Sequence, residues 1–111
     1  MQVLLSNRGN PDFGQDPNRP VYGTPNDKWA PAESIESASA LCRAYIAEHD
    51  LGGGNWTGGV VVQTGGNVAK GVAVAGLIAY NGRFFPVDEP HGYGKPTPIQ
   101  QRAVAKLNGR K

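Results

Sequence analysis

The sequence predicts an α+β protein, in which a small, mainly antiparallel sheet is packed by one major helix and followed by a short C-terminal helix. Three observations support this. Apolar residues recur at helical spacing over 33–50, apolar runs typical of strands follow, and an Asn-Gly pair separates two of those runs. A length of 111 residues suits a single domain spanning 1–111.

The chain begins with a short apolar run that predicts a strand at residues 2–6. Residues 7–31 then hold five prolines and show no apolar period, so we expect a long Pro/Gly-rich loop. Long loops in small domains are often functional or disordered. Phe13, Val21, Tyr22 and Trp29 argue against disorder. They either pin the loop to the core or contact a partner.

The major helix is expected at residues 33–50. Glu33 and Glu36 fall in its first turn, where the helix dipole favours acidic side chains. Gly52 is expected to end the helix as the left-handed residue after it. The predicted apolar stripe consists of Ile35, Ala38, Leu41, Cys42, Tyr45, Ile46 and His49.

A three-stranded meander is expected after the helix, at 59–63, 68–80 and 83–87. The Asn81-Gly82 pair predicts a two-residue turn of type I′, which would place Tyr80 opposite Arg83 and Ile78 opposite Phe85. Pro86 lacks a ladder donor and predicts an edge strand. Alternation along the middle strand then predicts two faces. One face carries Val72, Val74, Ile78 and Tyr80, and the other carries Ala73, Ala75, Leu77 and Ala79. The side chains of the second face are small enough for a helix to approach closely.

The C-terminal helix is expected at residues 98–107. Thr97 is a suitable N-cap, and Pro98 suits the first helical position. Its narrow apolar stripe would consist of Ile99, Ala103 and Leu107.

Charge is unevenly distributed along the chain. The formal net charge is +2, yet all nine acidic residues lie within the first 89 positions. The basic C-terminal segment either contacts nucleic acid or forms a solvated helix face whose cations suit a helix C-terminus. The residues that would contact phosphates are Arg102, Lys106, Arg110 and Lys111.

Patterns of enzyme sites are weak. The glycine-rich stretch LGGGNWTGG follows a helix instead of preceding one, so it does not fit a phosphate-binding loop. Cys42 falls on the apolar stripe, where cysteine usually acts as a small hydrophobic residue. Asp88, Glu89 and His91 match no known metal-ligand spacing. We therefore expect a non-enzymatic protein with no cofactor and no metal.

Surface recognition remains the leading hypothesis, and Trp56 is its centre. Glycines surround this tryptophan, so it either forms a lid over the end of the sheet or serves as an exposed anchor for a partner. Arg83 beside Tyr80 would extend that surface or stack at its rim. The candidate partner-binding residues are Asn55, Trp56, Thr57, Tyr80, Asn81 and Arg83.

Three segments carry a resemblance to a known group. ASALCRAYIAEHDLGGGNWTGG, IAYNGRFF and the opening VLLSNRGNPDFGQ resemble a recurrent pattern in uncharacterised small proteins of bacterial plasmids, integrative elements and prophages. The pattern covers about two-thirds of the chain and leaves out the C-terminal helix. It implies a mobile-element context and a joint role for Asn55, Trp56, Asn81, Gly82 and Arg83, but no catalytic residue.

Two functions are therefore expected. The first is a mobile-element accessory protein that binds and inhibits a host protein or ribonucleoprotein complex, such as an anti-CRISPR or antirestriction protein. The second is a nucleic-acid-binding or regulatory protein that uses the basic C-terminal helix. One cysteine and no secretory or membrane-spanning pattern favour the cytoplasm of a bacterial host. The oligomeric state is left open.

Overall fold

The computed structural model describes residues 1–17, 19–21, 28–64 and 72–107, without the side chains of Thr64 and Val72. One sheet of five strands, in the order β2-β1-β3-β4-β5, lies between two helices. Its strands are β1 (Gln2–Leu5), β2 (Lys28–Pro31), β3 (Val60–Thr64), β4 (Val72–Ile78) and β5 (Phe84–Pro86). All neighbouring pairs are antiparallel. The predicted α+β class is confirmed.

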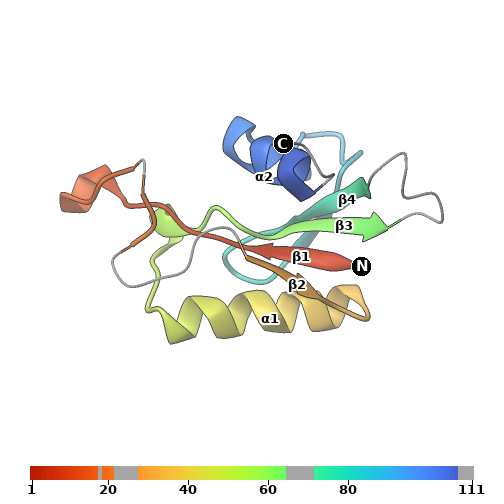
Figure 1. Cartoon of the computed structure of the whole chain (residues 1–111), viewed down its shortest axis with the longest axis horizontal. Helices are drawn as coiled ribbons and strands as arrows, with labels where there is room; N and C mark the ends of the chain where they lie inside the picture. The colour runs from red at the N-terminus through yellow and green to blue at the C-terminus, as the bar shows by residue number, and fades with distance from the viewer. Residues whose placement is uncertain (18, 22–27, 65–71, 108–111) are drawn as a thin grey trace.

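The two helices cover opposite faces of the sheet. Helix α1 (Ile35–Glu48) lies on one face and helix α2 (Pro98–Leu107) on the other (Figure 1). Successive strand residues point to opposite faces, so β1 sends Val3 and Leu5 toward α1 and Leu4 toward α2. Because both faces are covered, the central strands read as continuous apolar runs instead of alternating with polar residues. No helix of the described residues is long and apolar enough to cross a membrane.

Both helices start at side-chain caps. The cap at Ser34 starts α1 two residues later than expected, so Glu36 lies in the first turn but Glu33 precedes the helix. At α1, Ser34 accepts a hydrogen bond from the Ser37 N–H at 3.1 Å, and the Ser37 hydroxyl accepts one from the Ser34 N–H. At α2, Thr97 accepts from the Gln100 N–H at 3.3 Å, while Gln100 Oε1 accepts from the Thr97 N–H at 2.8 Å. This reciprocal box confirms Thr97 as the N-cap and fixes the predicted start of α2.

The end of α1 corrects the prediction for Gly52. The left-handed residue is Asp50, with a φ of 52°, whereas Gly52 is extended. The Leu51 N–H reaches Ile46 O at 3.0 Å and the Asp50 N–H reaches Ala47 O at 3.3 Å. These two bonds form a Schellman motif, and the buried Leu51 and Ile46 side chains belong to one core cluster. The chain reverses two residues earlier than the glycine suggested because this apolar contact favours that position.

The predicted loop at 7–31 contains more structure than expected. Residues Pro11–Phe13 form a 3-10 turn, and Lys28–Pro31 form strand β2, which pairs with β1. The segment 22–27, which includes Tyr22, lies outside the described residues. The residues of β2 show no local pattern typical of a strand. The strand forms through its pairing with β1, which is distant in the sequence.

The β4–β5 hairpin differs from the prediction by one residue in register. Ile78 pairs with Phe84 instead of Phe85, and the Gly82 N–H bonds to Ala79 O at 2.8 Å. Gly82 has a φ of 91°, so the connection is a turn followed by a left-handed glycine, not a two-residue type I′ turn. Strand β5 lies at an edge of the sheet, as Pro86 predicted.

A β-bulge overturns the predicted faces of β4. The register with β3 shifts between Val61, which pairs with Gly76, and Val62, which pairs with Val74. Ala75 is therefore an extra residue, and alternation reverses there. Val74 now packs on the α2 side together with Leu77, while Ile78 packs on the α1 side. The expected small face of alanines does not form.

Candidate functional site

Trp56 forms a lid over the end of the sheet and also borders an open groove. It follows a 3-10 turn at Gly53–Asn55 and its side chain is half-buried. Its Nε1–H donates to Ile78 O at 3.0 Å, and its ring centroid lies 6.0 Å from that of Tyr45. The geometry therefore agrees with the lid interpretation while leaving one part of the ring accessible.

The residues on either side of Trp56 are occupied within the fold. The buried Asn55 amide donates to Arg8 O at 3.0 Å and to Gln15 Oε1 at 2.9 Å. The Thr57 hydroxyl lies 3.2 Å from the Ser6 hydroxyl. These two predicted binding residues hold the entry to β3 in place and present little surface of their own.

The glycines after Trp56 allow a close approach between strands. Gly59 has a φ of 90°, and a Cβ at this position would lie 2.1 Å from Ile78 O. The Gly59 N–H bonds to Leu4 O at 2.7 Å, and the Ile78 N–H bonds to Gly59 O at 2.8 Å. The glycine-rich stretch thus lets the chain enter the sheet between β1 and β4, directly beside Trp56.

The end of the β4–β5 hairpin is tied to α1. The exposed Tyr80 donates its hydroxyl hydrogen to Leu51 O at 2.9 Å. Arg43 Nη1 donates to Asn81 O at 2.9 Å, and Ser39 Oγ donates to Gly82 O at 2.7 Å. Tyr80 and Asn81 therefore lie on the α1 side of the hairpin and line a separate hollow there.

Arg83 turns toward a different surface. Its guanidinium carbon lies 5.0 Å from the centroid of the Phe85 ring, a cation–π geometry. The Phe85 ring meets the edge of Tyr93 at 5.5 Å, and Tyr93 stacks on His91 at 5.5 Å. A continuous row of rings thus carries a cation at one end.

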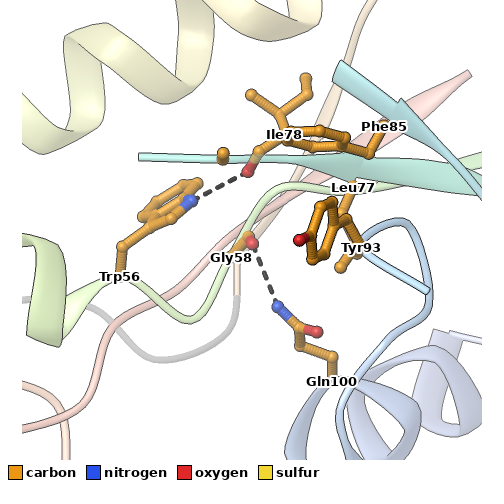
Figure 2. A pocket seen from close by; sticks show the side chains of 8 residues that line it. Trp56, Gly58, Leu77, Ile78, Phe85, Tyr93 and Gln100 are labelled. Carbon is orange, nitrogen blue, oxygen red and sulfur yellow. Dashed lines mark hydrogen bonds between the residues drawn. The ribbon is translucent and has the colours of Figure 1, made fainter. Parts of the chain in front are cut away.

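These rings border an apolar groove of about 430 Å³ between α2, β4 and β5, which we call the aromatic groove. Figure 2 shows Trp56 toward one end and Phe85 with Tyr93 toward the other. Gln100, buried on α2, donates from Nε2 to Thr57 O at 3.0 Å and to Gly58 O at 3.2 Å and closes one side. The lining consists of Trp56, Gly58, Leu77, Ile78, Ala79, Phe85, Tyr93 and Gln100.

The groove brings together two of the predicted binding residues and adds others. Trp56 lines it and Arg83 lies over one of its rings, whereas Phe85 and Tyr93 were not predicted. Tyr93 is 60% exposed and, like Trp56, lies between glycines in the sequence. That shared pattern could have pointed to Tyr93. The contact between Phe85 and Tyr93 depends on the return of the chain along β5.

The basic face of α2 points away from the sheet. Arg102 and Lys106 are exposed, while Ala103 is buried and Val104 and Leu107 pack against the sheet. In the first turn of α2, Gln100 is buried and the expected stripe residue Ile99 is only half-buried, while Val104 adds to the stripe of Ala103 and Leu107. Arg110 and Lys111 lie outside the described residues.

Of the groups considered for catalysis or metal binding, Cys42 is buried and Glu89 is bonded to His91. Cys42 is fully buried, and desolvation raises the pKa of its thiol to about 12. Desolvation pushes the pKa of the Glu89 carboxyl upward, but hydrogen bonds from the His91 ring and backbone outweigh it, so the net direction is downward. Within residues 1–17, 19–21, 28–64 and 72–107, no cluster of three or more His, Cys, Asp or Glu side chains is placed to hold a metal ion.

A comparison of the chain with protein-family models, curated proteins and solved structures found no significant match. Function is therefore inferred from the geometry of the site.

Proposed function

We propose that this protein is a small non-enzymatic accessory protein of a bacterial mobile genetic element, which binds a host macromolecular complex and inhibits it by occlusion. The observation that carries the proposal is the aromatic groove with Arg83 at its rim. Aromatic residues and arginine dominate the energetic centres of protein interfaces, and they act from well-packed, desolvated pockets.

Three features of the groove suit a protein partner. Its lining is largely apolar, so a partner side chain that enters it leaves water. Tyr93 and Trp56 are amphipathic rings of low conformational entropy, which lose little freedom on binding. Arg83 is exposed beside the groove and offers several donors to a carboxylate or a phosphate. A host protein or a ribonucleoprotein complex would present both kinds of group.

The finer part of the proposal is inhibition of a defence system, as an anti-CRISPR or antirestriction protein in the cytoplasm of the host. A mobile element benefits from such an inhibitor, and a protein of this size can occlude a site without chemistry of its own. The sequence resemblance to plasmid and prophage proteins supports this context.

A challenge assay tests the function. The protein is expressed in a bacterial strain that carries an active restriction or CRISPR system, and the efficiency of phage plating is measured. We expect the wild type to restore plating and the variants Arg83→Glu and Tyr93→Ala to lose this effect while still folding. Glu36→Ala, on the exposed face of α1, serves as the control. If both groove variants restored phage plating as fully as the wild type, the groove would have no part in the inhibition.

Binding of nucleic acid through α2 is the alternative. One observation favours it: Arg102 and Lys106 are exposed four residues apart on a helix that contains no acidic residue. If these two side chains contact phosphates, the logarithm of the binding constant should fall with the logarithm of salt concentration with a slope of about −1.8 from them alone. Binding that Arg102→Ala and Lys106→Ala leave unchanged would refute it.

A further inference from the structure

Phe13 is a large apolar side chain that the fold leaves unburied. It is 79% exposed, more than the other large exposed hydrophobic side chains, Tyr93 at 60% and Tyr80 at 42%. It ends the 3-10 turn Pro11–Phe13, which projects from the body of the molecule as the red-orange turn in Figure 1. We call residues 10–16 the N-terminal arm.

Hydrogen bonds hold the arm in one shape. Asn10 caps the 3-10 turn, since its Oδ1 accepts from the Asp12 N–H at 3.0 Å. Gln15 Oε1 accepts from the Asn10 N–H at 2.8 Å and from the Asn55 amide at 2.9 Å, which ties the arm to the turn before Trp56. An apolar side chain at the tip of such an arm loses little conformational entropy when it binds.

The arm and the aromatic groove are complementary in shape and charge. The groove has room for a phenyl ring, with a volume of about 430 Å³ and aromatic walls. Asp12, an exposed acid, accompanies Phe13 on the arm, whereas the exposed Arg83 lies over the Phe85 ring of the groove. The second acid of the arm, Asp16, is paired with Arg19 at 3.6 Å. Of the acids near the groove, Glu89 is engaged by His91 at 3.1 Å.

We propose that a second copy of this chain occupies the aromatic groove, with Phe13 of each copy in the groove of the other. Asp12 would then lie near Arg83 across the contact. A reciprocal contact of this kind closes as a two-fold dimer, whereas a one-way contact would extend into a chain of copies. The proposal rests on the arm and the groove alone, and it stands or falls independently of the proposed function. A host partner that uses the groove would compete with the second copy.

The mass in solution tests the proposal directly. Sedimentation equilibrium of the full chain at protein concentrations up to about 1 mM is expected to show a monomer–dimer equilibrium. Phe13→Ala should raise the dimer dissociation constant at least about tenfold, because it removes one buried ring from each contact. At protein concentrations well below the dimer dissociation constant, where both proteins are monomeric, it should leave the thermal unfolding curve unchanged, since Phe13 is exposed. A wild type that stays monomeric throughout, or an alanine variant that dimerises equally well, would overturn the proposal; masses above the dimer would contradict the reciprocal arrangement.

A charge-exchange experiment tests the orientation of the contact. Asp12→Lys and Arg83→Glu should each weaken self-association. An equal mixture of the two variants should form a dimer more readily than either alone, because both contacts of the mixed pair then join opposite charges. Glu36→Lys makes the same change of charge as Asp12→Lys, but on the exposed face of α1, and it should not change self-association. A mixture that associates no better than the single variants would rule out the proposed contact.

Discussion

Replacing Trp56 separates a structural lid from a pure binding anchor. The ring is half-buried, packs beside Tyr45 and donates to Ile78 O at 3.0 Å. Replacing a fully buried tryptophan with alanine lowers the free energy of unfolding by about 3–5 kcal/mol. Because the Trp56 ring is only half-buried, we expect its packing to contribute about 2 kcal/mol. The lost hydrogen bond adds about 1 kcal/mol. Trp56→Ala should therefore lower the free energy of unfolding by about 2–3 kcal/mol.

The assay is urea unfolding followed by far-ultraviolet circular dichroism, because the substitution itself removes a fluorophore. With a urea dependence of about 1–2 kcal/mol per molar, the midpoint should fall by more than about 1 M. Tyr80→Phe is the matched control, since it removes one hydrogen bond, to Leu51 O, from an exposed ring and should cost about 0.5 kcal/mol. If Trp56→Ala unfolds at the wild-type midpoint, the lid interpretation is wrong and the ring serves only a partner.

Three further predictions concern the backbone and the core. Asp50→Gly should stabilise the protein by about 0.5–1 kcal/mol in the same assay, because Asp50 has a φ of 52° and places an anion at a helix C-terminus; a loss of stability would contradict the assigned motif. Gly59→Ala should lower the free energy of unfolding by more than about 2 kcal/mol, because the new Cβ would clash with Ile78 O. Gly14→Ala, also at positive φ but with nothing within 4 Å, should lower it by about 1 kcal/mol. Equal losses would refute the close approach at Gly59. Cys42 should resist iodoacetamide at pH 8 until urea unfolds the chain. Burial raises the pKa of the folded thiol from its ordinary value of 9.0 to about 12. Its contribution to stability is therefore full below pH 9 and is lost as the pH rises to 12. The stability difference between wild type and Cys42→Ala should narrow over that range.

Local signals in the sequence predicted the helices well. The Thr97 and Gln100 box lies in four consecutive residues, and the structure begins α2 at Pro98, as predicted. The apolar period of α1 also lies within one segment. The end of α1 was wrong because the Schellman motif depends on the apolar contact between Leu51 and Ile46, and this contact outweighed the preference of glycine for the left-handed conformation.

Non-local pairing explains what the sequence did not reveal. Strand β2 exists because β1 offers it an edge, and the bulge at Ala75 arises from the register between β3 and β4. The aromatic groove has the same origin. Trp56 stood out by its glycine neighbours, but the rings at the other end of the groove, Phe85 and Tyr93, depend on the hairpin register and on the loop after β5.

The most direct test of the central claim, that the aromatic groove binds a host partner, is a comparison of captured proteins. Tagged wild type, Arg83→Glu and the control Glu36→Ala are each recovered from a nuclease-treated bacterial lysate, and the bound proteins are identified and quantified. We expect one stoichiometric partner with the wild type and the control and its loss with Arg83→Glu. Equal recovery with all three proteins, or capture that requires intact nucleic acid, would contradict the claim.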